Sequence, residues 1–290
     1  MVAILTTKDA LSDAERILTD AGVEAPGLEA ERLACHALGT NRAGLYAGLN
    51  YELGKAALET FLNYIKRRAE REPLQYITGS DEFCGLTILV TPDVLIPRPE
   101  TEVLVEAGTG LLKDNPGALI ADIGTGSGCI AVSLAVGLKT ATVYAVDSSA
   151  AALKLAERNA QANGLSGRVA FLEGDLFAPL EDKGLAGLLD LIVTNPPYIP
   201  GGELPGLQPE VLFEPLSALD GGPDGLDAIR RIIGDAPRYL KPGGTLLMEI
   251  GHDQSGLVRA LVDNAPGFEF IEFTKDFAGI ERVLVARRII

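Results

Sequence analysis

Seven short apolar runs alternate with stretches of helical length between residue 118 and the end of the chain. Such alternation predicts strands joined by helices, and these units form a mostly parallel sheet with right-handed crossovers. The run 189–194 is typical of a buried parallel strand. The other expected strands are 119–123, 142–146, 169–172, 245–250, 268–273 and 282–286, and the helices between them include 151–162 and 224–239. The sequence therefore predicts a Rossmann-like α/β fold with a seven-stranded sheet.

The first 73 residues carry helical periodicity instead. One apolar stripe covers 10–21 and a second covers 28–38, and each is followed by a glycine. Asn41 is suited to cap a short helix that continues to Tyr46. A third stripe consists of Leu53, Ala57, Leu58, Phe61, Leu62 and Ile65. These stripes predict a small N-terminal helical domain, residues 1–73, that contacts a partner or orients a substrate.

A linker is expected between the two patterns, over residues 74–97. The runs 87–90 and 94–96 are rich in strand formers and flank a turn at Pro92-Asp93. This arrangement predicts a β-hairpin. The larger domain is expected to span 98–290.

Acidic residues outnumber basic ones in both parts of the chain. Residues 1–97 hold nine Lys and Arg against fourteen Asp and Glu, and residues 98–290 hold sixteen against twenty-six. Nucleic-acid binding requires a basic face that neutralises phosphates, so this balance weighs against direct binding of DNA or RNA. One basic cluster, residues 66–68 with Arg71, lies at the end of a predicted helix, where it complements the helix dipole.

The cysteines and histidines show neither disulfide nor metal-ligand spacing. Cys35, Cys84 and Cys129 are scattered, and His36 lies far from His252. No apolar run is long enough to span a bilayer, and no signal-peptide pattern is present. These features predict a cytoplasmic protein without a bound metal or a membrane contact. Since no heptad or repeat is present, a monomer is expected.

A glycine-rich turn, Asp122-Ile123-Gly124-Thr125-Gly126-Ser127-Gly128, includes the end of the first strand of the larger domain. Glycines at a strand-to-helix turn let the backbone approach a ligand and aim helix N–H groups at it. Asp147 ends the second strand, 19 residues after Gly128, where a carboxylate accepts hydrogen bonds from ribose hydroxyls. This spacing fits NAD and S-adenosyl-L-methionine equally.

Two further acids favour S-adenosyl-L-methionine. Asp122 lies just before the glycines, where a negative charge suits an ammonium and a sulfonium better than a pyrophosphate. Asp175 ends the third strand, where a carboxylate can accept a hydrogen bond from an adenine amino group. The predicted cofactor-binding residues are Asp122, Gly124, Thr125, Gly126, Ser127, Gly128, Asp147, Asp175, Leu176 and Asn195.

The buried run 189–194 leads into Asn195-Pro196-Pro197-Tyr198. Open α/β sheets bind ligands at the carboxyl ends of their strands, so this segment is expected beside the cofactor. The two prolines make it a stiff, extended rim. The Asn195 side-chain oxygen and the Pro196 carbonyl would accept the two hydrogens of a planar NH2 group, and Tyr198 would cover its face.

Several other segments contribute, with the glycine turn and Asn195–Tyr198, to a resemblance to a known family. They are 72–79, 91–102, Glu214-Pro215, Ala218-Leu219 and Gly221-Gly222. Together with the glycine turn and Asn195–Tyr198, they resemble the peptide chain release factor N5-glutamine methyltransferases (the PrmC/HemK family) over nearly the whole chain. Cys84 is a departure, since the family usually has a large aromatic residue there.

The resemblance implies a class I methyltransferase domain, a small N-terminal helical bundle and a β-hairpin linker. It also implies S-adenosyl-L-methionine as cofactor and class I peptide chain release factors as partners. The acceptor would be the side-chain amide nitrogen of the glutamine in their Gly-Gly-Gln motif, whose methylation modulates translation termination.

Catalysis by positioning is expected at this site. No histidine or lysine lies between Gly184 and Lys241 to act as a base. Holding two reactants in line can lower a barrier by about 7–11 kcal/mol. Asn195, Pro196 and Tyr198 are therefore the candidate catalytic residues, and Pro197 completes the substrate-binding set.

Two other functions remain open from the residues alone. The same motif would hold the exocyclic amine of adenine (N6) or guanine (N2), although the acidic balance and the stretch 97–101 disfavour a nucleic-acid methyltransferase. A non-catalytic nucleotide-binding or interaction protein is the third possibility, which the intact Asn195–Tyr198 motif disfavours. Labelled cofactor, offered with release factor or with nucleic acid, separates the two enzymes.

Overall fold

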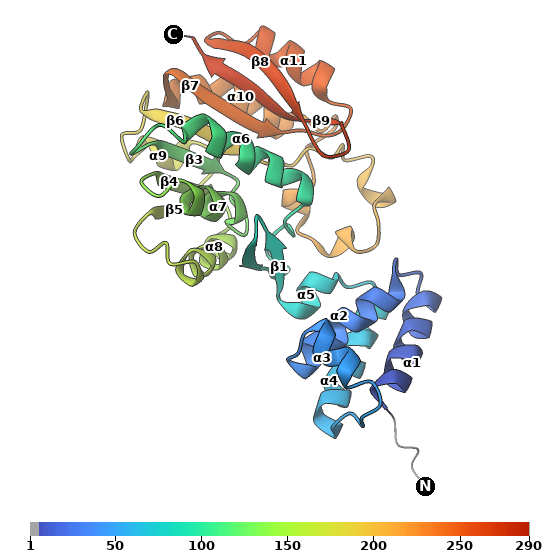
Figure 1. Ribbon diagram of the computed structural model, residues 1–290. Coiled ribbons are helices and arrows are strands. Elements are labelled where there is room, and N and C mark those ends of the chain that lie inside the picture. Colours follow the sequence, from blue (N-terminus) through green and yellow to red (C-terminus); the bar gives the residue numbers. More distant parts are fainter. Residues whose placement is uncertain (1–5, 290) are drawn as a thin grey trace. The chain divides into compact units, whose positions relative to one another are not determined.

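A computed structural model describes residues 6–289 (Figure 1). The chain divides into two compact units. A helical unit comprises Met1–Gly79 with Gln208–Phe213, and a sheet unit comprises Ser80–Leu207 with Glu214–Ile290. Residues 1–5 of the predicted helical domain lie outside the described residues.

The helical unit is built from short helices around an apolar core. Asn41 caps one of them, because its Oδ1 accepts a hydrogen bond from the backbone N–H of Gly44 at 2.9 Å, as the sequence predicted. Phe61 and Ile65 are buried, but Leu62 is 46 % exposed, so its predicted place on the buried face is wrong. The helices are α1 (Thr7–Asp20), α2 (Pro26–Leu38), α3 (Arg42–Ala47), α4 (Lys55–Ala69) and α5 (Leu74–Thr78).

A β-hairpin is present, but it is not the predicted one, because the run 94–96 forms no strand. Strands β1 (Ser80–Phe83) and β2 (Leu86–Leu89) pair antiparallel around Cys84-Gly85. Both turn residues have positive φ, 50° and 72°, as a two-residue hairpin loop requires. Because Pro92 cannot adopt positive φ, Pro92-Asp93 cannot form such a loop. It forms a separate turn, closed by a hydrogen bond from Val94 N–H to the Thr91 carbonyl. The beginning of the predicted linker, 74–78, is helix α5.

The sheet unit contains a seven-stranded sheet, as predicted. Its strand order is β5-β4-β3-β6-β7-β9-β8; β9 is antiparallel to both neighbours, and the other pairs are parallel. Each expected strand is present. The strands are β3 (Leu119–Ile123), β4 (Thr142–Asp147), β5 (Val169–Glu173), β6 (Leu189–Thr194), β7 (Leu240–Glu249), β8 (Phe268–Lys275) and β9 (Glu281–Arg288).

Helices cover both faces of this sheet (Figure 1). On one face, α6 (Glu102–Leu112), α7 (Cys129–Gly137) and α8 (Ala150–Ala162) pack with the hairpin over Ile120 and Leu191. On the other, α9 (Ala178–Glu181), α10 (Asp227–Tyr239) and α11 (Ser255–Asp263) pack over Ile192 and Met248. Burial of both faces explains why the central strands are almost continuously apolar.

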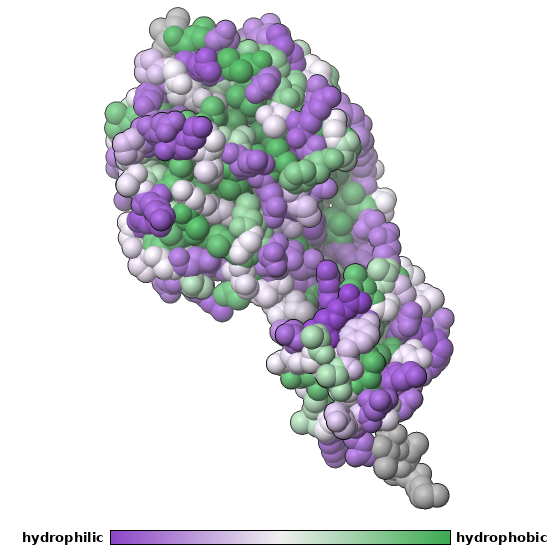
Figure 2. All heavy atoms as spheres, in the orientation of Figure 1, coloured by the Kyte–Doolittle hydropathy of each residue, from purple (hydrophilic) through white to green (hydrophobic). Residues whose placement is uncertain are grey.

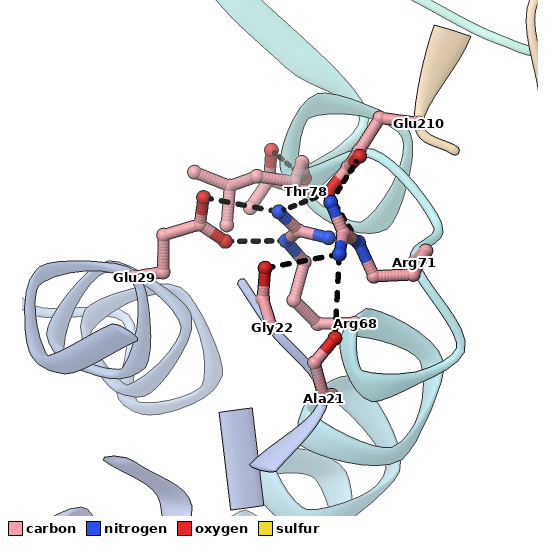
Figure 3. A network of polar contacts seen from close by, with 8 residues as sticks. Ala21, Gly22, Glu29, Arg68, Arg71, Thr78 and Glu210 are labelled. Carbon is pink, nitrogen blue, oxygen red and sulfur yellow. Dashed lines mark hydrogen bonds and ion pairs between the residues drawn. The ribbon is translucent and has the colours of Figure 1, made fainter. Parts of the chain in front are cut away.

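Four charged side chains hold the segment 208–213 within the helical unit (Figure 3). Arg71 Nε and Nη2 each lie 2.7 Å from a carboxylate oxygen of Glu210, which is a bidentate pair. Arg68 Nη2 donates to the same carboxylate at 2.9 Å, and its other side binds Glu29. Arg68 is only 4 % exposed. Arg68 and Arg71 of the basic cluster therefore form an ion-pair network, beyond the predicted dipole role.

The visible surface of each unit mixes hydrophilic and hydrophobic residues (Figure 2). Large exposed apolar side chains, such as Tyr51 and Phe277, come from distant parts of the sequence. Among residues 6–289, no helix has the length and apolar character needed to cross a membrane.

Candidate active site

A cavity of about 500 Å³ opens at the carboxyl ends of the parallel strands of the sheet unit. This volume falls in the usual range for small-molecule sites, about 300–1,000 Å³. The lining includes the end of β4 and residues that follow the ends of its neighbours β3, β5 and β6. The predicted site residues that line it are Gly124, Thr125, Gly126, Ser127, Asp147, Asp175, Leu176, Asn195 and Pro197. Asp122, Gly128, Pro196 and Tyr198 do not line it.

The glycine turn leaves β3 and leads into α7. A Cβ atom built on Gly124 or Gly126 would meet no atom within 4 Å, so the turn presents bare backbone to the cavity. Asp147 braces it, because its Oδ2 accepts a hydrogen bond from Gly126 N–H at 2.8 Å. Its Oδ1 accepts another from Ser149 N–H at 2.9 Å.

Gly128 has a structural role at the start of α7. Its φ is +77°, and a Cβ there would lie 2.8 Å from the Cβ of Ala156 on α8. Replacing Gly128 by alanine is expected to lower the free energy of unfolding by about 1–2 kcal/mol for the left-handed backbone, plus about 1–3 kcal/mol for overpacking. Urea unfolding measures the change. Gly164→Ala is the matched control, since its φ is +71° with no atom within 4 Å. Equal losses in the two variants would show that the Ala156 contact is unimportant.

Asp122 is fully buried beneath the turn. It was predicted to contact the cofactor, but it does not line the cavity. Its Oδ2 accepts hydrogen bonds from the Thr125 hydroxyl at 2.6 Å and from Ala131 N–H at 3.1 Å. Burial raises the pKa of Asp122 to about 7, although both hydrogen bonds oppose the shift. Among the described residues, its Oδ1 has no hydrogen-bond partner. The carboxylate thus fastens the turn to the start of α7.

Asp175 forms an ion pair with Arg231 of α10 across the cavity lining. The two side chains are 65 % and 56 % exposed, so the pair contributes little to stability. No signal in the sequence indicated Arg231 as a partner of Asp175.

Asn195 follows β6 and points its amide nitrogen at a buried hydroxyl. Its Nδ2 donates to Thr101 Oγ1 at 3.2 Å, and Thr101 donates to Glu249 Oε2 at 2.6 Å. Thr101 and Glu249 are 2 % and 1 % exposed. Burial raises the pKa of Glu249 to about 7, and the Thr101 hydrogen bond and the charge of Arg282 counteract it.

Tyr198 is placed differently from the prediction. It packs against the core on the α10 face of the sheet, and its hydroxyl lies 3.4 Å from Glu249 Oε1. Burial raises the pKa of the Tyr198 phenol. Its backbone carbonyl accepts a hydrogen bond from Gln254 at 3.0 Å. The ring therefore supports the end of the motif from behind instead of lining the cavity.

Arg98 lines another side of the cavity and pairs with Glu214, a pairing that the sequence reasoning missed. The carboxylate of Glu214 is buried and accepts hydrogen bonds from the Arg98 guanidinium and from Ile96 N–H, the latter at 3.0 Å. This pairing joins residues 96–98 to the long segment after Tyr198. In the sequence, both segments contribute only to the family resemblance.

The fold is that of a class I methyltransferase. The catalytic domain of hMettl16, solved with MAT2A 3'UTR hairpin 6, is similar with a TM-score of 0.55 and 17 % identity, covering 81 % of this chain and 82 % of that one. A methyltransferase from Pyrococcus furiosus is similar with a TM-score of 0.51 and 20 % identity, covering 71 % and 90 %. At these identities the likeness shows the fold alone.

Sequence comparison gives the family. Residues 9–79 match the PrmC N-terminal domain, and residues 100–211 match the methyltransferase small domain. The release factor glutamine methyltransferase of Moorella thermoacetica is 49 % identical over 98 % of this chain and 99 % of its own length. That of Geobacter sulfurreducens is 47 % identical over 98 % and 97 %. The chain belongs to the release factor glutamine methyltransferase family.

Proposed function

We propose that this enzyme transfers a methyl group from S-adenosyl-L-methionine to the side-chain N5 of the glutamine in the Gly-Gly-Gln motif of class I release factors. The observation that carries the proposal is the meeting of the glycine turn and Asn195 at one cavity, in a chain of this family. We propose further that it acts in the cytoplasm, as a monomer, without binding nucleic acid directly.

The residues at the cavity fit the cofactor. The bare backbone of Gly124 and Gly126 leaves room for its amino-acid part, and the Asp147 carboxylate can accept hydrogen bonds from ribose hydroxyls. Asp175 and Leu176 would hold the adenine. When bound, the cofactor supplies an electrophilic methyl group on its sulfonium.

The Asn195-Pro196 segment would hold the acceptor amide. An amide nitrogen is a weak nucleophile, because its lone pair is delocalised into the carbonyl. Asn195 Oδ1 would accept one of its hydrogens. The carbonyl of Pro196, a buried residue between the lining residues Asn195 and Pro197, would accept the other, and together they would keep the nitrogen in line with the methyl group. The same two acceptors stabilise the positive charge that develops on nitrogen during transfer. The proton can leave afterwards, so no base is needed in the transfer step.

A transfer assay tests the substrate class. Methyl-labelled S-adenosyl-L-methionine is incubated with the enzyme and with release factor, with DNA or with RNA. Label is expected in the release factor only. Label in a nucleic acid and none in the release factor would support an exocyclic-amine methyltransferase, and label in none of them would support a non-catalytic binding protein.

A further inference from the structure

Asn195 can offer a substrate either of the two ends of its side-chain amide. An NH2 acceptor group needs the oxygen end, since the nitrogen end would set two donors against each other. The surroundings of Asn195 therefore have to select one orientation. The described residues near its amide supply one side-chain partner, the hydroxyl of Thr101.

The hydrogen-bond direction in this cluster follows from the carboxylate. A hydroxyl has one hydrogen to donate. The separation of 2.6 Å between Thr101 Oγ1 and Glu249 Oε2 is typical of a hydroxyl that donates to an ionised carboxylate. With its hydrogen committed to Glu249, Thr101 can only accept from Asn195. The amide nitrogen must then face Thr101, which turns Oδ1 toward the cavity.

We propose that Thr101 and Glu249 are positioning residues that hold the Asn195 amide with its oxygen toward the substrate, a role that rests on the proposed function above. Thr101 closes the 3₁₀ turn Pro99–Thr101, and Glu249 ends β7, which neighbours β6, the strand that Asn195 follows. Both side chains are almost fully buried, which shields the hydrogen bond between Thr101 and Glu249 from water.

Protonation of Glu249 removes this preference for one orientation of the Asn195 amide. A protonated Glu249 can donate to Thr101, whose own hydrogen is then free to bond Asn195 Oδ1 and reverse the amide. The groups facing Glu249 are the hydroxyls of Thr101 and Tyr198 and the charges of Arg282 and Glu100. Because burial raises the pKa of Glu249 to about 7, the orientation with Asn195 Oδ1 toward the substrate is lost as the pH falls through neutrality.

A double-mutant cycle tests whether Thr101 acts through Asn195. Thr101→Val keeps the shape and removes the hydroxyl. It is expected to lower the single-turnover rate of methyl transfer to release factor by about 10²-fold, the effect of a misplaced reacting group. Thr101→Ser retains the hydroxyl and should recover most of that rate. In an Asn195→Ala background Thr101→Val should change the rate little. An equal loss in both backgrounds would overturn the positioning role.

The pH profile tests Glu249 separately. The wild-type rate should fall on the acid side of about pH 7, and Glu249→Gln should abolish that acid limb. Asp122 also has a pKa raised to about 7, so it is the alternative source of such a limb. Persistence of the limb in Glu249→Gln would assign it to Asp122 or another group and contradict the proposal.

NMR of the enzyme without substrate tests the positioning role independently of the proposed function. In ¹⁵N-asparagine-labelled protein, the side-chain NH2 signal of Asn195 is identified by its loss in Asn195→Ala. It should shift with pH near neutrality in the wild type and not in Glu249→Gln. A pH-independent signal would overturn the positioning role even in an active enzyme. A titrating signal in an enzyme that leaves release factor unmethylated would refute only the substrate.

Discussion

Replacing Asn195 by alanine is expected to lower the rate of methyl transfer to release factor by about 10²- to 10³-fold, as for loss of one preorganised polar group at a transition state. The variant loses one of two acceptors for the substrate NH2 group and also leaves Thr101 without its donor. S-adenosyl-L-methionine should bind with nearly unchanged affinity, since the glycine turn and Asp147 are untouched. Single-turnover kinetics and titration calorimetry measure the two quantities.

Asn264→Ala is the matched control. Asn264 is exposed on the sheet unit, and its side chain only caps the end of α11 through the Ala260 carbonyl. Its loss should leave both rate and affinity as in the wild type. An Asn195→Ala rate within a few-fold of the wild type would show that the amide is not held by this side chain.

The second large effect is expected on stability. Arg68→Ala should lower the free energy of unfolding of the helical unit by about 3–5 kcal/mol, because removing one partner of a buried ion pair leaves the other charge uncompensated. Glu29 loses its bidentate partner, and Glu210 keeps only Arg71 (Figure 3). Urea unfolding of the full chain, followed by amide hydrogen exchange in the helices and in 208–213, measures the loss.

The neighbouring Arg67 provides the control on the same helix. It pairs with Glu72, and its side chain is 35 % exposed, so Arg67→Ala should cost only about 0–1 kcal/mol. Equal destabilisation by the two variants would show that the buried network contributes no more to stability than the pair of Arg67 with Glu72.

Acid should weaken the same network. Burial alone would raise the pKa of Glu210, but hydrogen bonds from Arg71 and Arg68 outweigh it and lower the pKa to about 2. A depressed carboxyl pKa adds stability above the unfolded-state value of about 4.3, and this stability disappears as the pH falls toward 2. In Glu210→Gln, the loss of stability over this pH range should be smaller than in the wild type.

The strands and the glycine turn were predictable because local sequence signals specify each of them. Apolar runs of strand length and glycines at a strand end depend on neighbours in sequence, and the order of α/β units then brings four strand ends together. Asn41 as a cap is a signal of the same local kind. The hairpin turn was mispredicted because Pro92-Asp93 is a strong turn signal, whereas Cys84 reveals nothing of its positive φ.

The supporting contacts could not be predicted, because they join distant residues. Thr101 and Glu249 are 148 positions apart, and Glu210 lies 139 positions from Arg71. No periodicity or spacing relates such pairs. Asp122 was assigned to the cofactor from its place beside the glycines, and only the packing of α7 over β3 shows that its carboxylate is covered. Tyr198 likewise had no signal to tell a cavity-facing ring from a core-facing one.

The glutamine side chain of a release factor is the most direct reporter of the central claim. Purified release factor is treated with the enzyme and S-adenosyl-L-methionine, digested, and the Gly-Gly-Gln peptide is sequenced by tandem mass spectrometry. One added methyl group on the glutamine side chain, absent when Asn195→Ala replaces the wild type, is the predicted result. An unmodified glutamine, or a methyl group on another residue of the peptide, would contradict the account.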